Sequence, residues 1–152
     1  MSRAGGIEIV RVAGPGGQVL RPELLEPAQP VHRQLRPHLS GDYVQQMRDI
    51  FVDGAEMVVA IVDGTVRGLA VFRIFSNTHA GRRFYVDDLV TDEMHRSSGV
   101  GSALLRWLEA ASRERGCNGV DLESGTQRTR AHRFYFREGF FVTGFSFRKA
   151  FE

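Results

Sequence analysis

The chain has 152 residues, a formal net charge of +2 at pH 7, and 42% hydrophobic and 25% charged residues, which together predict one globular domain over residues 1–152. No apolar run reaches the roughly 20 residues of a membrane span, the N-terminus has no apolar signal segment, and the lone Cys117 excludes an intramolecular disulfide. These absences predict a cytoplasmic protein without a membrane partner, and a charge of +2 gives no argument for nucleic acid.

The first half of the chain shows alternating and hairpin patterns. Ile7 to Val12 alternates apolar and polar residues, which predicts a strand. From Val19 to Arg36, prolines 22, 27, 30 and 37 are expected to interrupt any long helix and leave one or two short helical pieces. Tyr43 to Phe51 follows N-cap residues and has a helical apolar stripe. Glu56 to Val62 and Val66 to Phe75 flank an Asp-Gly pair, which predicts a hairpin.

The second half alternates strands with helices. Arg82 to Thr91 is the next predicted strand, antiparallel to the one before it, and Ser102 to Arg115 has the broad apolar face of a buried helix. The short strand Gly119 to Glu123 then completes a βαβ unit with parallel pairing. A helix over Thr129 to Glu138 and one or two strands in Phe140 to Phe151 finish the chain. These elements predict a mixed α/β sheet in which an antiparallel meander leads into a central βαβ unit with flanking helices.

A glycine-containing loop lies between the predicted strand 82–91 and the predicted helix 102–115. The first turn of a helix has backbone N–H groups without intrahelical partners, and its dipole favours negative charge. Gly99 and Gly101 would let a phosphate approach the backbone, and Arg96 adds a fixed positive charge. The loop also follows the carboxyl end of a strand, where open α/β sheets bind ligands. The predicted phosphate site consists of Arg96, Ser97, Ser98, Gly99, Val100, Gly101 and Ser102.

Two common phosphate-binding motifs do not fit this loop. The P-loop of kinases and NTPases requires a lysine, and the loop has none. The dinucleotide motif requires a third glycine after the first strand of several βαβ repeats, whereas Gly99 and Gly101 follow the fourth predicted strand and a single repeat. Both classes are therefore disfavoured.

Two motifs together resemble the GCN5-related N-acetyltransferase (GNAT) superfamily, which moves an acetyl group from acetyl-CoA to an amine. Arg96-x-x-Gly99-x-Gly101 resembles its pyrophosphate-binding motif. The sequence Ala-His-Arg-Phe-Tyr-Phe-Arg-Glu-Gly-Phe, from Ala131 to Phe140, resembles its later motif Ala-x-x-Phe-Tyr-x-x-x-Gly-Phe. One motif alone would be a weak signal, but the pair in this order is specific, and the resemblance covers most of the chain. It implies the GNAT fold and acetyl-CoA as cosubstrate.

The resemblance also implies which residues contact CoA. The phosphates would bind the loop from Arg96 to Ser102. The peptide-like pantetheine arm would pair, like an added strand, with the backbone of Leu89, Val90 and Thr91. The candidate set further includes His132 and Tyr135, although a lone histidine on this helix is more often a packing residue than a base. Many members have asparagine where this chain has Arg128, so Arg128 is open to contact with a CoA phosphate or with the substrate instead.

Acetyl transfer needs a group that protonates the departing thiolate. The resemblance places the hydroxyl of Tyr135 at the CoA sulfur, which makes Tyr135 the candidate general acid. The competing interpretation is that Phe134-Tyr135-Phe136 is simply core packing, as aromatic clusters usually are. Three consecutive helical residues cannot all face one side, however, and a buried tyrosine needs a partner for its hydroxyl.

The amine must also lose a proton before it can attack. Asp87 and Asp88 are expected on opposite faces of their strand, and the resemblance turns Tyr85, Asp87 and Leu89 toward the acceptor. Asp87 is therefore the candidate base, acting directly or through a water, or the group that attracts a cationic amine. The alternative interpretation is that Asp87 is an ordinary hydrogen-bonded residue of the strand. Asp88 is expected to make a structural hydrogen bond, and Glu123 is the reserve base.

Other functions stay open at this point. A CoA-binding sensor or assembly module without catalysis would need the same loop, although Tyr135 and Asp87 favour the enzyme. Nucleic-acid binding would rest on four arginines that more often form a solvated helix face, namely Arg128, Arg130, Arg133 and Arg137. No spacing of His, Cys, Asp and Glu suggests a metal site. The acceptor is expected to be a small cationic amine, and the Phe-rich tail is either core or a homodimer contact.

Overall fold

The computed structural model describes residues 2–4, 6–39 and 41–152. The chain divides into two compact units, Met1–Asp121 and Leu122–Glu152, and each is described by itself. The expectation of a single domain stays a prediction. Within the described ranges, no helix combines the length and apolar character needed to cross a membrane.

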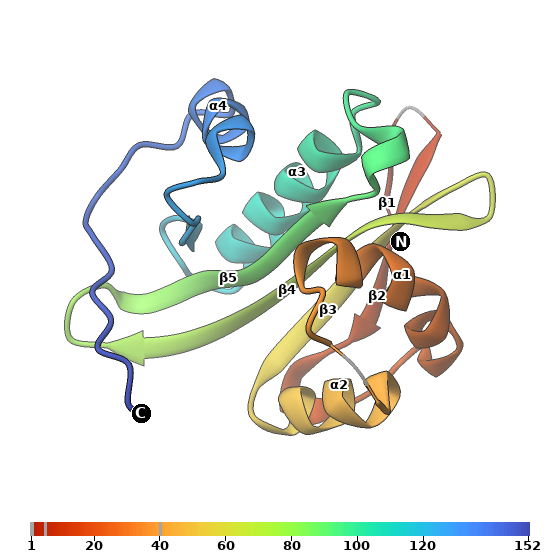
Figure 1. Cartoon of the computed structure of the whole chain (residues 1–152), viewed down its shortest axis with the longest axis horizontal. Helices are drawn as coiled ribbons and strands as arrows, with labels where there is room; N and C mark the ends of the chain where they lie inside the picture. Colours follow the sequence, from red (N-terminus) through yellow and green to blue (C-terminus); the bar gives the residue numbers. More distant parts are fainter. Residues whose placement is uncertain (1, 5, 40) are drawn as a thin grey trace. The chain divides into compact units, whose positions relative to one another are not determined.

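The first unit is built on a sheet whose strands follow their order in the sequence (Figure 1). The described strands are β1 Ser2–Ala4, β2 Ile7–Ala13, β3 Ala55–Val62, β4 Thr65–Asn77, β5 Gly81–Thr91 and β6 Asp121–Leu122. The strands from β1 to β5 pair antiparallel with their neighbours, and β6 follows β5 in the sheet order. The predicted mixed α/β fold with an antiparallel meander is confirmed, although β6 is shorter than the predicted strand over residues 119–123.

The hairpin between β3 and β4 shows how local sequence sets the meander. Asp63 and Gly64 both have positive φ, 49° and 76°, as the type I′ turn of a two-residue hairpin requires. Glycine adopts this conformation without strain, and aspartate is among the residues that tolerate it. The predicted hairpin is therefore confirmed at the level of its turn.

The helices of the first unit are α1 Leu25–Leu35, α2 Tyr43–Val52 and α3 Val100–Glu114, with short 3₁₀ turns η1 Pro15–Gly17, η2 Pro22–Leu24 and η3 Glu93–His95. The predicted one or two helical pieces are present as η2 and α1, but Pro27 and Pro30 do not interrupt the 11-residue α1. Pro22 starts η2, and Pro27 lies in the first turn of α1, where the missing N–H would have no helical partner anyway. Only Pro30 lies inside the helix, and burial of the apolar side offsets its cost.

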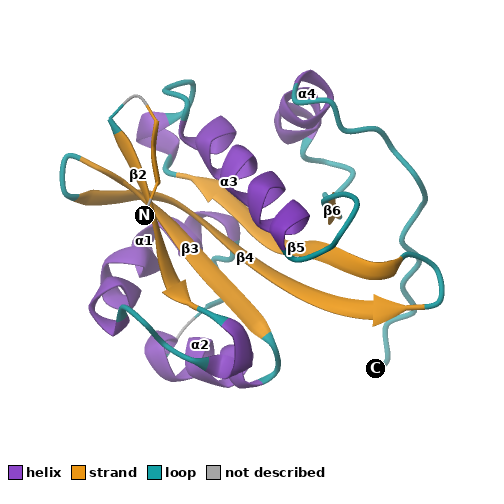
Figure 2. Cartoon of the chain, turned by 180° about the vertical axis from the view of Figure 1, so that it is seen from behind, coloured by secondary structure: helices purple, strands orange, loops and turns teal. Residues whose placement is uncertain are grey.

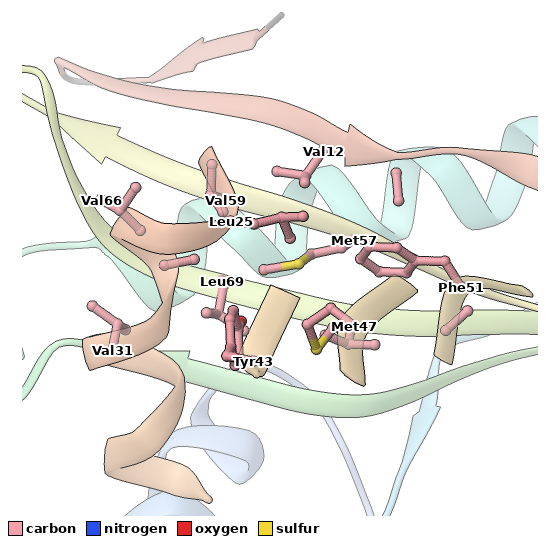
Figure 3. Packing of buried hydrophobic residues seen from close by; sticks show 14 of the residues in the cluster. Val12, Leu25, Val31, Tyr43, Met47, Phe51, Met57, Val59, Val66 and Leu69 are labelled. Carbon is pink, nitrogen blue, oxygen red and sulfur yellow. The ribbon is translucent and has the colours of Figure 1, made fainter. Parts of the chain in front are cut away.

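The helices cover both faces of the sheet. Figure 2 shows α1 and α2 on one side of the central strands and α3 on the other. The main apolar cluster joins α1 and α2 to the sheet, with Leu25, Tyr43, Met47 and Phe51 packed on Met57 and their neighbours (Figure 3). On the α3 side, the rings of Phe72 and Trp107 are 5.9 Å apart. Both faces of the central strands are thus buried, which holds β5 and the start of α3 in place.

Gly68 lets the first turn of α3 lie close to β4. A Cβ atom at Gly68 would be 2.7 Å from Val100 Cγ1 and 3.1 Å from Leu104 Cδ1. Gly68→Ala is therefore expected to destabilise the protein by about 1–3 kcal/mol, the usual cost of overpacking. Urea unfolding measures this, with Gly119→Ala as control, because a Cβ at Gly119 would have no atom within 4 Å. Equal stability of the two variants would contradict this close approach.

The second unit contains α4, Thr129–Arg137, which is close to the predicted helix 129–138. Beyond it the structure has no helix or strand over residues 140–152, so the prediction of one or two final strands is wrong. A strand is held by hydrogen bonds to a neighbour, and within this unit only Leu122 belongs to one. The apolar side chains of the tail are exposed, namely Phe141, Val142, Phe145, Phe147 and Phe151.

Candidate active site

The loop that was predicted to bind phosphate runs from η3 into α3. Ser97 and Gly99 have positive φ, 68° and 89°, and α3 begins at Val100, two residues before the predicted start. The last three residues of the predicted site, 100–102, are therefore the first turn of the helix. Gly99 supplies no side-chain cap to the N–H groups of that turn, and residues 96–99 are exposed. This geometry places the exposed Arg96 beside the first turn of a 15-residue helix, at the positive end of its dipole.

Asp92 anchors the chain just before this loop. Its side chain is buried and accepts hydrogen bonds from Gln34 Nε2 at 3.1 Å, Arg67 Nη1 at 3.0 Å and the Met94 N–H at 3.2 Å. Glu93 N–H in turn donates to Gln34 Oε1 at 2.8 Å. The end of β5 is thereby tied to α1 and β4, which fixes where the loop starts.

Strand β5 has a bulge at Asp87. Val71 of β4 pairs with Asp88 and Phe72 pairs with Val86, so Asp87 has no cross-strand partner. The expected placement of Asp87 and Asp88 on opposite faces is wrong because this extra residue interrupts the alternation. Asp88 shares a face with Val71, which packs in the α1–α2 core.

The carboxylate of Asp87 lies on this same face. It forms an ion pair with Arg73, with Nη2 and Nε of the arginine 2.6 and 2.8 Å from Oδ2. Arg73 alternates with Phe72, which contacts α3, and therefore points to the opposite side of β4. Leu89 pairs with Ala70 and lies beyond the bulge, so it does not continue the row begun by Tyr85.

Asp88 belongs to a polar network that sequence analysis missed. Its Oδ2 is 2.7 Å from His32 Nε2, and its Oδ1 accepts from Arg36, whose Nε and Nη2 are 2.9 and 2.7 Å away. His32 Nδ1 is 2.7 Å from the Tyr43 hydroxyl, and both of these side chains are 2% exposed. The expected structural hydrogen bond of Asp88 is therefore present. The available signal was the four-residue spacing of His32 and Arg36, which places them on one face of a helix.

In the second unit, the sequence motif around Tyr135 forms the C-terminal end of helix α4. Helix α4 ends in a Schellman motif, with Gly139 at φ 93° and hydrogen bonds from Gly139 N–H to Phe136 O (3.1 Å) and from Phe140 N–H to Tyr135 O (2.9 Å). The rings of Tyr135 and Phe140 are 5.5 Å apart, which is the apolar contact that accompanies this motif. The spacing Tyr-x-x-x-Gly-Phe thus fixes the tyrosine ring at the end of the helix.

The environment of Tyr135 keeps its hydroxyl protonated. Burial raises the pKa of the Tyr135 phenol, and the positive charge of Arg128 offsets part of that rise. His132 Nε2 is 2.8 Å from Gly125 O, which ties α4 to the preceding loop and agrees with a hydrogen-bonding role. Glu123, the reserve base, is exposed. The second unit therefore brings together Tyr135, Arg128 and His132, and the first unit brings together the loop, Asp87 and residues 89–91.

Comparison with known proteins gives a consistent family. The model of the acetyltransferase (GNAT) family matches residues 21–140. The uncharacterised N-acetyltransferase YhdJ of Bacillus subtilis is 33% identical over 123 residues, which are 79% of this chain and 87% of that protein. The aminoalkylphosphonate N-acetyltransferase of Salmonella typhimurium is 34% identical over 60% of each chain. The chain belongs to the GNAT family.

The likeness extends to solved structures. The aminoglycoside N-acetyltransferase AAC(6')-Iy, solved in complex with CoA, superposes with a TM-score of 0.80 over 99% of this chain and 97% of its own, at 17% identity. At this identity the match shows the fold alone. The GNAT match spans both units and ends at residue 140, where the Schellman motif ends, so the tail over 141–152 lies outside it. This GNAT protein is an acetyl-CoA-dependent N-acetyltransferase.

The polar network of this GNAT enzyme gives its stability a pH dependence. Burial would raise the pKa of Asp88, but the hydrogen bonds and charges of His32 and Arg36 outweigh burial and lower it. A lowered folded pKa means that the carboxylate stabilises the fold above its unfolded value of about 3.9. This stabilisation is lost as the pH falls through the folded pKa.

Asp88→Asn is therefore expected to lower stability at pH 7 by roughly 1.5–3 kcal/mol, the range for hydrogen bonds to charged groups. The variant should also lose less stability than the wild type between neutral and acid pH. Urea unfolding across pH measures both effects, with the exposed Asp53→Asn as control. If the free energy of unfolding fell equally with decreasing pH in wild type and Asp88→Asn, the Asp88 carboxylate would not be the source of this pH dependence.

Proposed function

We propose that this enzyme transfers the acetyl group of acetyl-CoA directly to a small amine, which is cationic in its ammonium form. The CoA phosphates bind the loop from Arg96 to Ser102, the pantetheine arm lies along residues 89–91, and Tyr135 protonates the leaving thiolate. Asp87 accepts the proton of the amine, directly or through a water. No covalent enzyme intermediate is needed.

The observation that carries this proposal is the loop at the start of α3. Its exposed arginine, its left-handed residues Ser97 and Gly99, and the positive end of the long helix α3 suit the binding of an anion. An adjacent phosphate pair suits this surface because backbone N–H groups and Arg96 supply several donors. Gly68 helps to fix the position of this loop, because it lets the start of α3 lie close to β4.

Strand β5 supports the placement of pantetheine. Residues 89–91 pair with β4 at Ala70, Leu69 and Gly68, which uses one edge of β5. The two-residue β6 neighbours β5 at its other edge, and the proposal places the peptide-like arm at that edge along residues 89–91.

The surroundings of the two candidate side chains support their proposed roles. A phenol is neutral at pH 7 at its ordinary pKa of about 10, and burial raises the pKa of Tyr135 further, so it has a proton to donate. Asp87 is held by Arg73, with Nη2 2.6 Å from Oδ2, and this ion pair orients the carboxylate proposed to accept the proton. Pairing of Asp87 with Arg73 and of Asp88 with Arg36 also balances the charge on this face. The small size of the acceptor is therefore better supported than a strong preference for cations.

Named relatives agree with a small acceptor. The names of two similar proteins specify aminoalkylphosphonates and aminoglycosides as substrates, and both compounds carry amines on small molecules. A panel of primary amines that contains both classes, together with amino acids and peptide N-termini, is therefore the appropriate first test.

Thiol release from acetyl-CoA across this panel tests the proposal. We expect one class of small amine to give release at a rate well above that of acetyl-CoA alone, with the acetylated amine detected by mass spectrometry. Calorimetry with CoA, run in parallel, separates binding from turnover. CoA binding without acetyl transfer to any amine would contradict the proposed reaction.

A further inference from the structure

The bulge in β5 leaves Asp87, the residue proposed as base, without backbone pairing to β4. Because Asp87 has no partner in β4, the antiparallel ladder does not set the position of its backbone. The carboxylate can act on an amine only if the backbone that carries it is held within a fraction of an ångström. Some other group must therefore hold this peptide unit.

Arg36 contacts the bulge directly. It is the C-cap residue of α1, and its Nη2 donates a hydrogen bond to the Asp87 carbonyl oxygen at 3.1 Å. The same guanidinium reaches the Asp88 carboxylate through Nε and Nη2, at 2.9 and 2.7 Å. One planar group thus bridges the two consecutive residues of the bulge, which a lysine with a single ammonium would not reproduce.

The position of Arg36 is set by buried groups behind it. Asp88 Oδ2 is 2.7 Å from His32 Nε2, and His32 Nδ1 is 2.7 Å from the Tyr43 hydroxyl. His32 Nε2 donates to the acceptor-only carboxylate of Asp88, and the Tyr43 hydroxyl shares a hydrogen bond with Nδ1. The chain of hydrogen bonds runs from α2 through α1 to β5, and its inner members are almost fully buried.

We propose that Arg36 is a positioning residue for acetyl transfer: oriented by Asp88, His32 and Tyr43, it holds the bulge of β5 and so fixes the Asp87 carboxylate. This inference rests on the proposed function, in which Asp87 accepts the proton of the amine. Arg36 does not touch the reacting atoms and acts through Asp87. Its side chain is 39% exposed, whereas that of its partner Asp88 is 15% exposed, so its removal is expected to act on turnover as well as on folding.

Arg36→Ala tests this assignment, with Arg33→Ala as the matched control. Arg33 lies on the same helix and is exposed. We expect Arg36→Ala to lower kcat by about 10–100-fold, as displacement of a reacting group does, with KM for acetyl-CoA kept within about twofold. Arg36→Lys should recover little of the lost kcat, and Arg33→Ala should match the wild type.

A double variant separates positioning from a general structural effect. If Arg36 acts through Asp87, the kcat of Arg36→Ala combined with Asp87→Asn should equal that of the more impaired single variant. Losses that simply multiply would overturn the proposal. A fall in kcat that Arg33→Ala shares would overturn it as well.

Hydrogen exchange gives a readout that needs no acceptor. Arg36→Ala should speed amide exchange at residues 86–89 and leave the rest of β5 unchanged, because the carbonyl contact lies at the bulge. Unchanged exchange at these amides would overturn the proposal even if every amine tested is inert. Failure of the proposed function appears differently, as wild-type enzyme that acetylates no amine while the bulge still loosens in Arg36→Ala.

Discussion

Gly99→Asp is expected to abolish CoA binding in a protein that still folds. Gly99 is the N-cap of α3 with φ 89°, and a side chain there would occupy the space where the diphosphate approaches the helix. The new carboxylate would also repel the phosphates. A Cβ at this position has space, since the nearest atom, Ile7 Cδ1, is 3.9 Å away, but the positive φ strains any residue other than glycine, so the variant is expected to fold with lower stability. Loss of two charge-assisted hydrogen bonds alone would weaken binding by roughly 100-fold or more.

Gly99→Asn is the matched control for this experiment. Asparagine has nearly the size of aspartate, is neutral, and is among the residues that adopt positive φ most readily. Calorimetry with CoA should therefore rank the affinities as wild type, then Asn, then Asp, and the gap between the two variants measures the charge. Circular dichroism and thermal unfolding confirm that both variants are folded. Equal affinity of wild type and Gly99→Asp for CoA would place the phosphates elsewhere.

The parts of the fold that were predicted correctly depend on local sequence. Residues close in the sequence determine the conformation of three such parts: the Asp63-Gly64 turn, the helix at 43–52 and the glycine after α4. The loop before α3 belongs to the same class, since the start of a helix after Gly99 can be inferred from neighbouring residues, although the left-handed conformation of Ser97 was not predicted. Only the exact start of α3 differed, by two residues.

The prolines of α1 were misjudged because their effect depends on where the helix begins. Pro22 and Pro27 are compatible with a 3₁₀ turn and with the first turn of a helix that starts at Leu25. The sequence does not mark that start with an N-cap side chain, and the structure has none. Burial of Leu25 and Val31 against the sheet, a tertiary effect, decides the outcome.

The bulge at Asp87 could not be predicted from a single strand. Residues 85–90 read Tyr-Val-Asp-Asp-Leu-Val, which does not say where an extra residue lies, and only pairing with β4 reveals it. The network of Asp88 has the same origin, because His32 lies 56 positions away in the sequence. Such contacts depend on the register of the sheet and on the packing of α1, neither of which the local pattern contains.

Tyr135→Phe is expected to lower kcat by about 10²–10⁴-fold, the usual contribution of a positioned general acid. The phenyl ring keeps its contact with Phe140, 5.5 Å between ring centres, and the Schellman hydrogen bonds involve only the backbone. Stability and the position of the ring should therefore be retained. CoA affinity should be nearly unchanged, since the proposed phosphate and pantetheine contacts lie on other residues.

Steady-state kinetics with an acceptor from the amine panel checks this prediction. The loss should appear in kcat with KM for acetyl-CoA nearly constant, as expected for an interaction made only in the transition state. Asp87→Asn should differ, because part of its loss should be recovered at higher pH, where more of the free amine is already deprotonated. Single-turnover measurements on Tyr135→Phe guard against a slow product release that would mask the chemical step. Wild-type rates in that experiment would show that solvent protonates the thiolate, and Tyr135 would then serve only to pack against Phe140.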